Sequence, residues 1–197
     1  MNINSKKIIF IGDSHTWFFS GDPKAREMQE EAKVDSSRWT PVFTIGSYNS
    51  DKAMFMWRIG TTAYSLNLGL LKEIVGDNKI EAGSTIVFNF GAIDLHKNLE
   101  KYDNAKKVVN RYVNICTSFA NLYKANPIFA SPMYNGNSKN YDIFVESLKK
   151  ESRLRGLDDP LVLVGNIVPR EFEKDDEHNH LNKEDSKRCL EYMLSKI

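Results

Sequence analysis

The sequence predicts a three-layer α/β/α fold, in which a flavodoxin-like, parallel five-stranded sheet carries helices on both faces. Short apolar runs alternate with helical patterns along the chain, and this alternation is typical of a sheet built from strand-helix-strand units. The runs are almost continuously apolar, which indicates strands that are buried on both faces. With 197 residues and 41% hydrophobic content, the chain is expected to form a single domain over residues 1–197.

Five apolar runs are expected to form the strands. Residues 7–11 contain the run Ile-Ile-Phe-Ile, which is too short for a buried helix and is rich in β-branched and aromatic side chains. Further strands are predicted at residues 41–45, 84–90, 127–131 and 161–164. In such a sheet, ligands bind at the carboxyl ends of the strands, because the loops there expose backbone and polar groups.

Helices are expected between and after these strands. Residues 102–126 carry apolar side chains at three- and four-residue steps, which predicts a helix with one buried face. The residues on that face are Val109, Tyr112, Val113, Cys116, Phe119, Ala120 and Tyr123. Residues 62–75, 141–155 and 182–197 are also predicted to be helical.

Composition and charge exclude several classes of partner. Lys and Arg number 27 and Asp and Glu number 26, so the net charge of +1 gives no reason to expect nucleic acid or an anionic membrane as the partner. Cys116 and Cys189 lack metal-ligand spacing, and we expect two reduced, packed thiols. No apolar segment approaches the roughly 18 residues of a membrane span and the first residues lack a secretory signal pattern, so a cytoplasmic location is expected. Residues 20–38 are charged and contain Pro23, which favours a solvated connection with at most a short surface helix.

The cluster Gly-Asp-Ser-His, directly after the first predicted strand, is the first candidate for chemistry. A serine hydroxyl becomes a nucleophile when a neighbouring base, usually histidine, accepts its proton. Placing Ser14 after a strand exposes its oxygen, and backbone N–H groups at the start of the next helix can stabilise an oxyanion. The alternative is that Ser14 only caps that helix, and the cluster by itself does not decide between the two.

The second candidate is the segment Asp-Asp-Glu-His-Asn-His-Leu-Asn, which begins at Asp175. His180 stands just before the last predicted helix, whose N-cap is expected to be Asn182, and Glu177 lies three residues before His180. A carboxylate close to a histidine can hold the ring in the tautomer that a base needs and can stabilise the imidazolium. The alternative is a solvated acidic loop with surface histidines.

Together, the two ends of the chain resemble the first and last sequence blocks of the GDSL, or SGNH, hydrolases. The resemblance covers nearly the whole chain, since its length and α/β alternation also suit that family. It implies that Ser14 is the nucleophile, that His180 is the base and that Glu177 is the orienting acid. The family usually has Asp at the acid position, so Asp176 and Asp175 are rivals of Glu177 for this role.

Two middle blocks supply the oxyanion hole in that family. The glycine block is matched by Gly60, which is expected to open a helix with its N–H towards a ligand. The block Gly-x-Asn-Asp is matched by Gly91 and Asp94, but Ile93 stands where the family has the oxyanion Asn. An Ile side chain donates no hydrogen bond, and the loss of one such donor can cost roughly 10²- to 10³-fold in rate. Asp94 is expected to organise its loop through backbone hydrogen bonds.

Three explanations of Ile93 stay open. Asn89, Thr61 or His96 can supply another donor, the main-chain N–H groups of the nucleophile and of the glycine block can suffice, or hydrolytic power has been lost. The pattern Gly-x-Ile-Asp also resembles that of GDSH-type members of the superfamily associated with polysaccharide biosynthesis. That likeness implies that Ile93 is compatible with activity.

Asp13 and His15 flank the serine and are counted with the oxyanion and substrate-binding residues. His15 has no counterpart in the Gly-Asp-Ser-Leu form of the block, and it can orient substrate, bond to a carboxylate or pack at the helix start. The Asp-x-His pattern also resembles binuclear metallophosphoesterases, with Asp94, His178 and His180 as further ligands. The other blocks of that family are absent, so no metal ligand is predicted.

These observations predict an SGNH-type serine hydrolase without a cofactor, an esterase or O-deacetylase that acts on an acylated sugar or another small ester. Acyl transfer to a sugar hydroxyl is an equal outcome, because hydrolysis and transfer proceed through the same acyl-enzyme. A non-catalytic module that holds a glycan or an acyl group is the alternative, which Ile93 motivates. Trp17, Phe18 and Tyr134 are candidates to line the acceptor side. The acyl group, the acceptor and the oligomeric state are left open.

Overall fold

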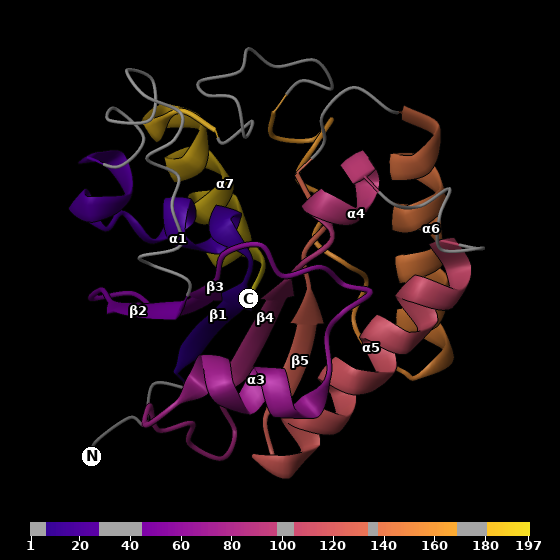
Figure 1. Ribbon diagram of the computed structural model, residues 1–197, viewed down its shortest axis with the longest axis horizontal. Coiled ribbons are helices and arrows are strands. Elements are labelled where there is room, and N and C mark those ends of the chain that lie inside the picture. The colour runs from indigo at the N-terminus through magenta and orange to yellow at the C-terminus, as the bar shows by residue number, and fades with distance from the viewer. Residues whose placement is uncertain (1–6, 28–44, 98–104, 134–137, 169–180) are drawn as a thin grey trace.

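The computed structural model describes residues 7–27, 45–97, 105–133, 138–168 and 181–197. Its centre is a five-stranded sheet with the strand order β2-β3-β1-β4-β5 (Figure 1). The strands are β1 (Ile8–Gly12), β2 (Ile45–Asn49), β3 (Met54–Arg58), β4 (Thr85–Asn89) and β5 (Asn126–Phe129). The α/β sheet predicted from the sequence is therefore confirmed.

One edge of the sheet differs from the predicted all-parallel arrangement. β3, β1, β4 and β5 are parallel, whereas β2 runs antiparallel to β3, with Ile45 opposite Arg58 and Asn49 opposite Met54. The connection between β2 and β3 is a tight turn, in which Ser50 N–H donates to the Ala53 carbonyl oxygen at 3.0 Å. Such a short connection allows a hairpin but not the crossover that a parallel pair needs.

Three strand predictions are confirmed, since β1, β4 and β5 fall on residues 7–11, 84–90 and 127–131 with small shifts at the ends. The strand predicted at 41–45 starts instead at Ile45 as β2, and residues 41–44 lie outside the described part of the chain. The strand predicted at 161–164 is wrong: Leu161 forms a single parallel bridge to Ala130, and the chain turns at residues 165–167.

The helices are α1 (Ser14–Ser20), α3 (Leu68–Val75), α4 (Ala92–Lys97), α5 (Ala105–Leu122), α6 (Ser138–Leu154) and α7 (Lys183–Lys196). α5, α6 and α7 confirm three predicted helices. The helix predicted over 62–75 begins only at Leu68, because the Asn67 side chain caps it by accepting a hydrogen bond from Leu70 N–H at 3.0 Å. Residues 23–27, within the predicted solvated connection, are also helical. No helix in the described segments is long and apolar enough to cross a membrane.

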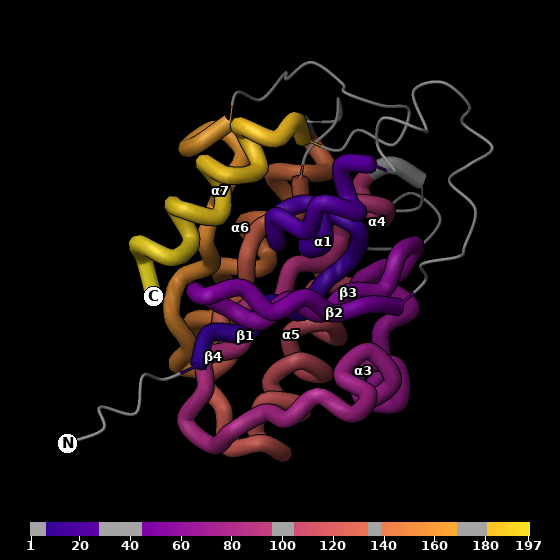
Figure 2. The backbone as a smooth tube through the Cα atoms, turned by 90° about the vertical axis from the view of Figure 1, so that its left-hand side faces the viewer, coloured from indigo at the N-terminus to yellow at the C-terminus, as the bar shows by residue number. Residues whose placement is uncertain are grey.

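The helices cover both faces of the sheet. α1 and α7 lie together on one face, α3 and α5 lie on the other, and α6 packs along α5 (Figure 2). The apolar face predicted for α5 is buried over Val109–Ala120, and Cys116 and Cys189 are buried free thiols. Contact between α1 and α7 brings together the two ends of the chain that carry the predicted catalytic motifs.

Candidate active site

The Gly-Asp-Ser-His cluster turns the chain from β1 into α1. Asp13 has an extended backbone (φ −84°, ψ −160°), and its carboxylate accepts a hydrogen bond from His15 N–H at 3.0 Å. Asp13 is therefore the N-cap, and the capping role considered for Ser14 is wrong: Ser14 is the first residue of the helix. Ser14 is partly exposed, while the rest of α1 is buried. This turn, which we call the Ser14 elbow (residues 12–15), leaves the serine as its accessible residue.

Gly12 allows the elbow to be this tight. A Cβ at this position would lie 2.0 Å from Oγ1 of Thr16 and 2.3 Å from the carbonyl oxygen of Asn89. The first contact is with α1 and the second with the end of β4. Only glycine permits helix, strand and neighbouring strand to approach so closely.

The loop after β3 emerges beside the elbow, because β3 and β1 are parallel neighbours and Trp57 pairs with Gly12. Gly60 in this loop has a φ of +76°, a backbone conformation that strongly favours glycine. A Cβ there would meet nothing within 4 Å, so the backbone conformation and not crowding selects glycine. The expectation that Gly60 opens a helix is wrong: it lies in an exposed turn, and α3 starts at Leu68.

Asp94, in the first turn of α4, holds this loop. Its carboxylate is fully buried and accepts hydrogen bonds from Ala63 N–H at 2.7 Å and Tyr64 N–H at 3.2 Å. These contacts agree with the loop-organising role expected for Asp94. Gly91, just before α4, has a φ of +118°, and a Cβ there would lie 2.7 Å from Cζ of Phe144 on α6. Both the backbone conformation and the packing against α6 therefore require glycine.

Asp13, in the elbow, and Asp94, in α4, form a buried acid pair. Loss of solvent raises the pKa of Asp13 from 3.8 to about 7, and the charge of Asp94 adds to the effect, while N–H groups of His15 and Ala92 oppose it. Loss of solvent also raises the pKa of Asp94 from 3.8 to about 6, against its two backbone hydrogen bonds. Because Asp13 accepts from the first turns of both α1 and α4, this pair joins the starts of the two helices at the site.

The aromatic residues of α1 face the core. Trp17 and Phe18 are 1% and 2% exposed, so the suggestion that they line an acceptor site is wrong. The His15 side chain is buried, with its ring centroid 6.5 Å from that of Phe19, as expected of a residue that packs at the helix start. Its role in orienting substrate stays a prediction. Tyr134 lies outside the described residues.

No protein-family model and no curated protein matches the sequence. Among solved structures, the chain is similar to a protein from Desulfitobacterium hafniense DCB-2 described as lipolytic and of the G-D-S-L family, with a TM-score of 0.62 and 18% identity over 98% of this chain and 99% of that one. It is also similar to the psychrotrophic esterase EstA from Pseudoalteromonas sp., in a structure inhibited by monoethylphosphonate (TM-score 0.57, 13% identity, 96% and 95% covered). A third similar structure is a family 3 carbohydrate esterase from Clostridium thermocellum (TM-score 0.55, 13% identity, 96% and 94% covered).

The chain has the SGNH-hydrolase fold. In this SGNH fold, the residues matched to the first three blocks follow three adjacent strands, β3, β1 and β4. They are Gly60 after β3, Asp13, Ser14 and His15 after β1, and Gly91 and Asp94 after β4. Since the strands are parallel, these loops leave the sheet at the same edge. The fold thus brings together three of the four motifs that the sequence suggested.

Ile93, which stands where the family has the oxyanion Asn, lies in the first turn of α4, and its side chain is partly buried. Two of the three substitute donors considered for it are buried as well. Asn89 is 2% exposed and its amide donates to the Ser131 carbonyl oxygen at 2.9 Å, and Thr61 is 1% exposed. Nothing is described of the His96 side chain. Asn89 and Thr61 are therefore poorly placed to replace the missing Asn at an accessible oxyanion hole.

The last motif that the sequence suggested, with His180, Glu177, Asp176 and Asp175, lies outside the described residues. The chain is described again from Leu181, the neighbour of His180. Leu181 is buried, and its carbonyl oxygen accepts from Nη1 of Arg26 at 3.0 Å. Arg26 also donates to the Phe18 carbonyl oxygen at 3.4 Å and lies 5.2 Å above the Phe18 ring. The residue next to His180 is thus held against α1, the helix that Ser14 begins.

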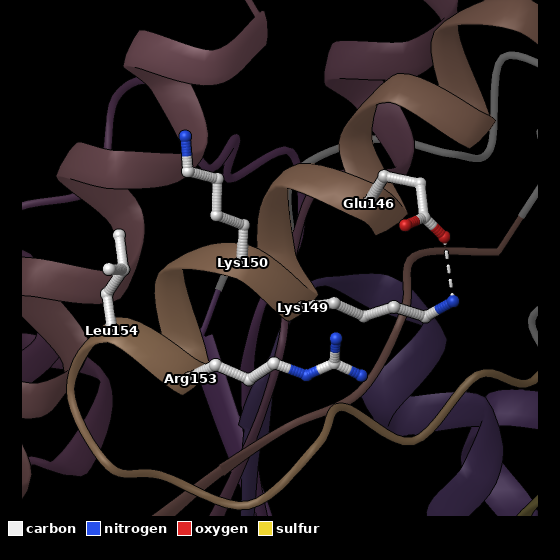
Figure 3. A pocket seen from close by; sticks show the side chains of 5 residues that line it. All are labelled: Glu146, Lys149, Lys150, Arg153 and Leu154. Atoms are coloured by element: carbon white, nitrogen blue, oxygen red, sulfur yellow. Dashed lines mark hydrogen bonds and ion pairs between the residues drawn. The ribbon is translucent and has the colours of Figure 1, made fainter.

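Two surface hollows lie along α6. One, of about 310 Å³, is lined by Glu146, Lys149, Lys150, Arg153 and Leu154 (Figure 3). The other, of about 560 Å³, lies between α5 and α6 and is lined by Lys106, Asp142, Ile143, Glu146, Ser147, Lys150 and Glu151. In the first hollow Lys149 pairs with Glu146 at 2.7 Å, as Figure 3 shows. Neither hollow is lined by a residue of the predicted site, so neither changes where the site is placed.

The metal-dependent alternative has little support in the described residues. Among them, no group of three or more His, Cys, Asp or Glu side chains is arranged to hold a metal ion. Two of the ligands considered for it, His178 and His180, lie outside the described part of the chain. The carboxylate of Asp13 accepts from His15 N–H, and that of Asp94 accepts from Ala63 and Tyr64 N–H in the loop after β3.

Proposed function

We propose that this protein is an SGNH-type serine hydrolase, an esterase or O-deacetylase that acts on an acylated sugar or another small ester. The observation that supports the proposal most is the Ser14 elbow. It presents a partly exposed serine at the carboxyl end of a central strand, in a fold shared with a lipolytic protein and two esterases. The site needs no cofactor for this chemistry.

In the proposed mechanism, Oγ of Ser14 attacks the acyl carbonyl carbon while His180 takes the serine proton. The tetrahedral intermediate collapses to an acyl-enzyme, and His180 returns the proton to the leaving alcohol. Water then attacks the acyl-enzyme with the same base and releases the carboxylic acid and the free serine. Glu177 holds the imidazolium, with Asp176 and Asp175 as rivals for that role. The anchoring of Leu181 by Arg26 supports His180 as the base, because it keeps the adjoining residue beside α1.

The oxyanion hole in this proposal consists of the backbone N–H groups of Ser14 and Gly60. The burial of Asn89 and Thr61 supports this choice over a substitute side chain. Loss of the side-chain donor at Ile93 predicts a slower reaction than in a site that keeps the Asn, by up to roughly 10²- to 10³-fold. If a sugar hydroxyl replaces water in the second step, the same acyl-enzyme gives acyl transfer.

Ile93 favours a second candidate function, a non-catalytic module that holds a glycan or an acyl group. Such a module does not need a nucleophile at the elbow. Reactivity of Ser14 therefore separates the two candidates.

The experiment is labelling by a fluorophosphonate probe, read by peptide mass spectrometry. Fluorophosphonates form a covalent bond with the oxygen of an activated serine, and esterase EstA, which has the same fold, was solved in a form inhibited by monoethylphosphonate. We expect an adduct on Ser14 that survives EDTA and disappears in Ser14→Ala. A matched control is Ser195→Ala, which removes the exposed hydroxyl of a serine on α7 and should leave labelling intact.

Absence of an adduct on folded protein would reject the nucleophile and favour the binding module. Labelling together with hydrolysis of p-nitrophenyl acetate would support the esterase, and a panel of acetylated sugars would then define the substrate class.

A further inference from the structure

The loop between β3 and α3 is held by hydrogen bonds of its own and by Asp94. The Thr62 and Ser65 hydroxyls lie 2.7 Å apart, and Ser65 N–H donates to the Thr62 hydroxyl at 2.9 Å. Asp94 binds the N–H groups of Ala63 and Tyr64 from the buried side. Hydrogen bonds within the loop and to Asp94 therefore define the conformation of residues 62–65.

Arg111 on α5 holds the same loop from its solvent side. Its guanidinium Nη1 donates to the carbonyl oxygen of Tyr64 and lies over the Tyr64 ring, 5.7 Å from the centroid. Tyr64 thus donates its backbone N–H to Asp94, offers its carbonyl to Arg111 and stacks its ring under the same Arg. Figure 1 shows the chain between β3 and α3 reaching across to α5.

Gly60 lies at the start of this loop, in the turn that follows β3. Gly60 has a φ of +76°. The direction of its N–H is therefore set by the chain on either side of it, which is β3 before it and the hydrogen-bonded loop after it. Thr61, the next residue, is buried, and its N–H donates to the Arg58 carbonyl oxygen at 3.4 Å. Thr61 continues directly into residues 62–65, so the conformation of that segment sets where the Gly60 turn ends.

We infer that Arg111 is a positioning residue for the oxyanion hole, which acts through Tyr64 to fix the loop that carries the Gly60 N–H. The inference rests on the proposed hydrolase function. In a site where Ile93 supplies no side-chain donor, the few backbone donors carry more of the transition-state stabilisation. A residue that fixes one of them then affects the chemical step although it does not touch the substrate.

The test compares Arg111→Met with Lys107→Met, which removes another exposed cation from the same helix. Steady-state hydrolysis of p-nitrophenyl acetate gives kcat and KM, and thermal unfolding checks the fold of each variant. We expect Arg111→Met to lower kcat about 10-fold and to leave KM within about twofold, because the lost contribution appears only in the transition state. Arg111→Lys should recover part of kcat, since an ammonium can still donate to the Tyr64 carbonyl and lie over its ring.

Equal kcat values in Arg111→Met and the wild type, or equal losses in Arg111→Met and Lys107→Met, would overturn the inference. So would a loss of kcat that only follows a fall in the fraction of folded protein. If Arg111→Met does not fold, Arg111→Ala, which also removes both the donor and the cation, decides, and an unchanged kcat in that variant rejects the positioning role. A wild-type protein without hydrolysis and without Ser14 labelling would instead reject the proposed function, so the two failures are distinguishable.

Discussion

The buried acid pair makes the free energy of unfolding depend on pH. In the unfolded chain both carboxyl groups lose their protons near the ordinary pKa of 3.8, whereas in the folded protein Asp13 does so near 7 and Asp94 near 6. At pH values between about 3.8 and about 7, the folded protein holds more protons than the unfolded chain. Linkage then requires the free energy of unfolding to fall as the pH rises through this window.

The size of the effect follows from the pKa values. Between about pH 5 and about pH 8, Asp13 should cost the folded state roughly 3 kcal/mol and Asp94 roughly 1 kcal/mol. The perturbation is Asp13→Asn, because Asn is also a good N-cap and can still accept from His15 N–H. In this variant, the fall between the two pH values should shrink by roughly 3 kcal/mol.

The assay is urea unfolding followed by tryptophan fluorescence, with linear extrapolation to water at each pH. Asp51→Asn, which changes an exposed carboxylate in the turn between β2 and β3, is the matched control and should keep the slope of the wild type. The window stays above about pH 5 because Glu151 and Asp159, whose pKa values are lowered by Arg155 and Arg153, lose their stabilising contribution at lower pH. The same slope in Asp13→Asn and in the wild type would refute the reasoning.

Two glycine substitutions test the packing around the site. Gly12→Ala places a methyl group where α1 and β4 leave no room, and the free energy of unfolding in urea should fall by roughly 3 kcal/mol or more. Gly91→Ala combines an unfavourable backbone conformation with a clash against Phe144, and should lose about 2 to 5 kcal/mol. Phe144→Leu should recover part of that loss in the double variant, while Gly156→Ala, which shares the positive φ but has open space, should lose only about 1 kcal/mol. A loss at Gly91 no larger than at Gly156 would contradict the proposed clash.

Local sequence signals were sufficient for most of the central sheet and for the longer helices. The runs that form β1, β4 and β5 are mostly apolar and are buried on both faces of the sheet. Such strands can be recognised from a continuous apolar run, without an alternation of apolar and polar residues. α5 has a clear buried face, and the Asn182 cap fixes the start of α7, where its side chain accepts from Asp185 N–H at 2.7 Å.

The errors arose where tertiary pairing decides the structure. β3 is the run Met-Phe-Met-Trp-Arg, which lacks β-branched residues but is buried over its first four positions and bounded by turn residues, a signal that could have identified it. Residues 161–164 have the composition of a strand, but only Leu161 pairs with the sheet side of the chain, through hydrogen bonds of 2.8 Å to the Phe129 carbonyl oxygen and from Ser131 N–H, while Val164 forms a local bridge to Val168.

At the site, the motif residues could be predicted because strand ends and turns have local signatures. Arg111 and Arg26 could not, since their contacts span 47 and 155 residues of sequence. Arg26 lies within residues 20–38, which the sequence predicts to be a solvated connection because the segment is charged. A cation that binds two distant carbonyl groups has the same local sequence appearance as one that faces water.

The contact of Arg26 with Leu181 also has a consequence for how the protein reaches its active state. Ser14, the proposed nucleophile, begins α1, and His180, the proposed base, precedes α7 in the sequence, so the proposed site depends on the docking of α7 on α1. During synthesis from the N-terminus, the sheet and the elbow can form while the last helix is still missing. Closing so long a segment is slow compared with forming local contacts. Esterase activity would therefore report on the last tertiary event of folding, and chains that lack the final helix should be inactive whatever the state of their sheet.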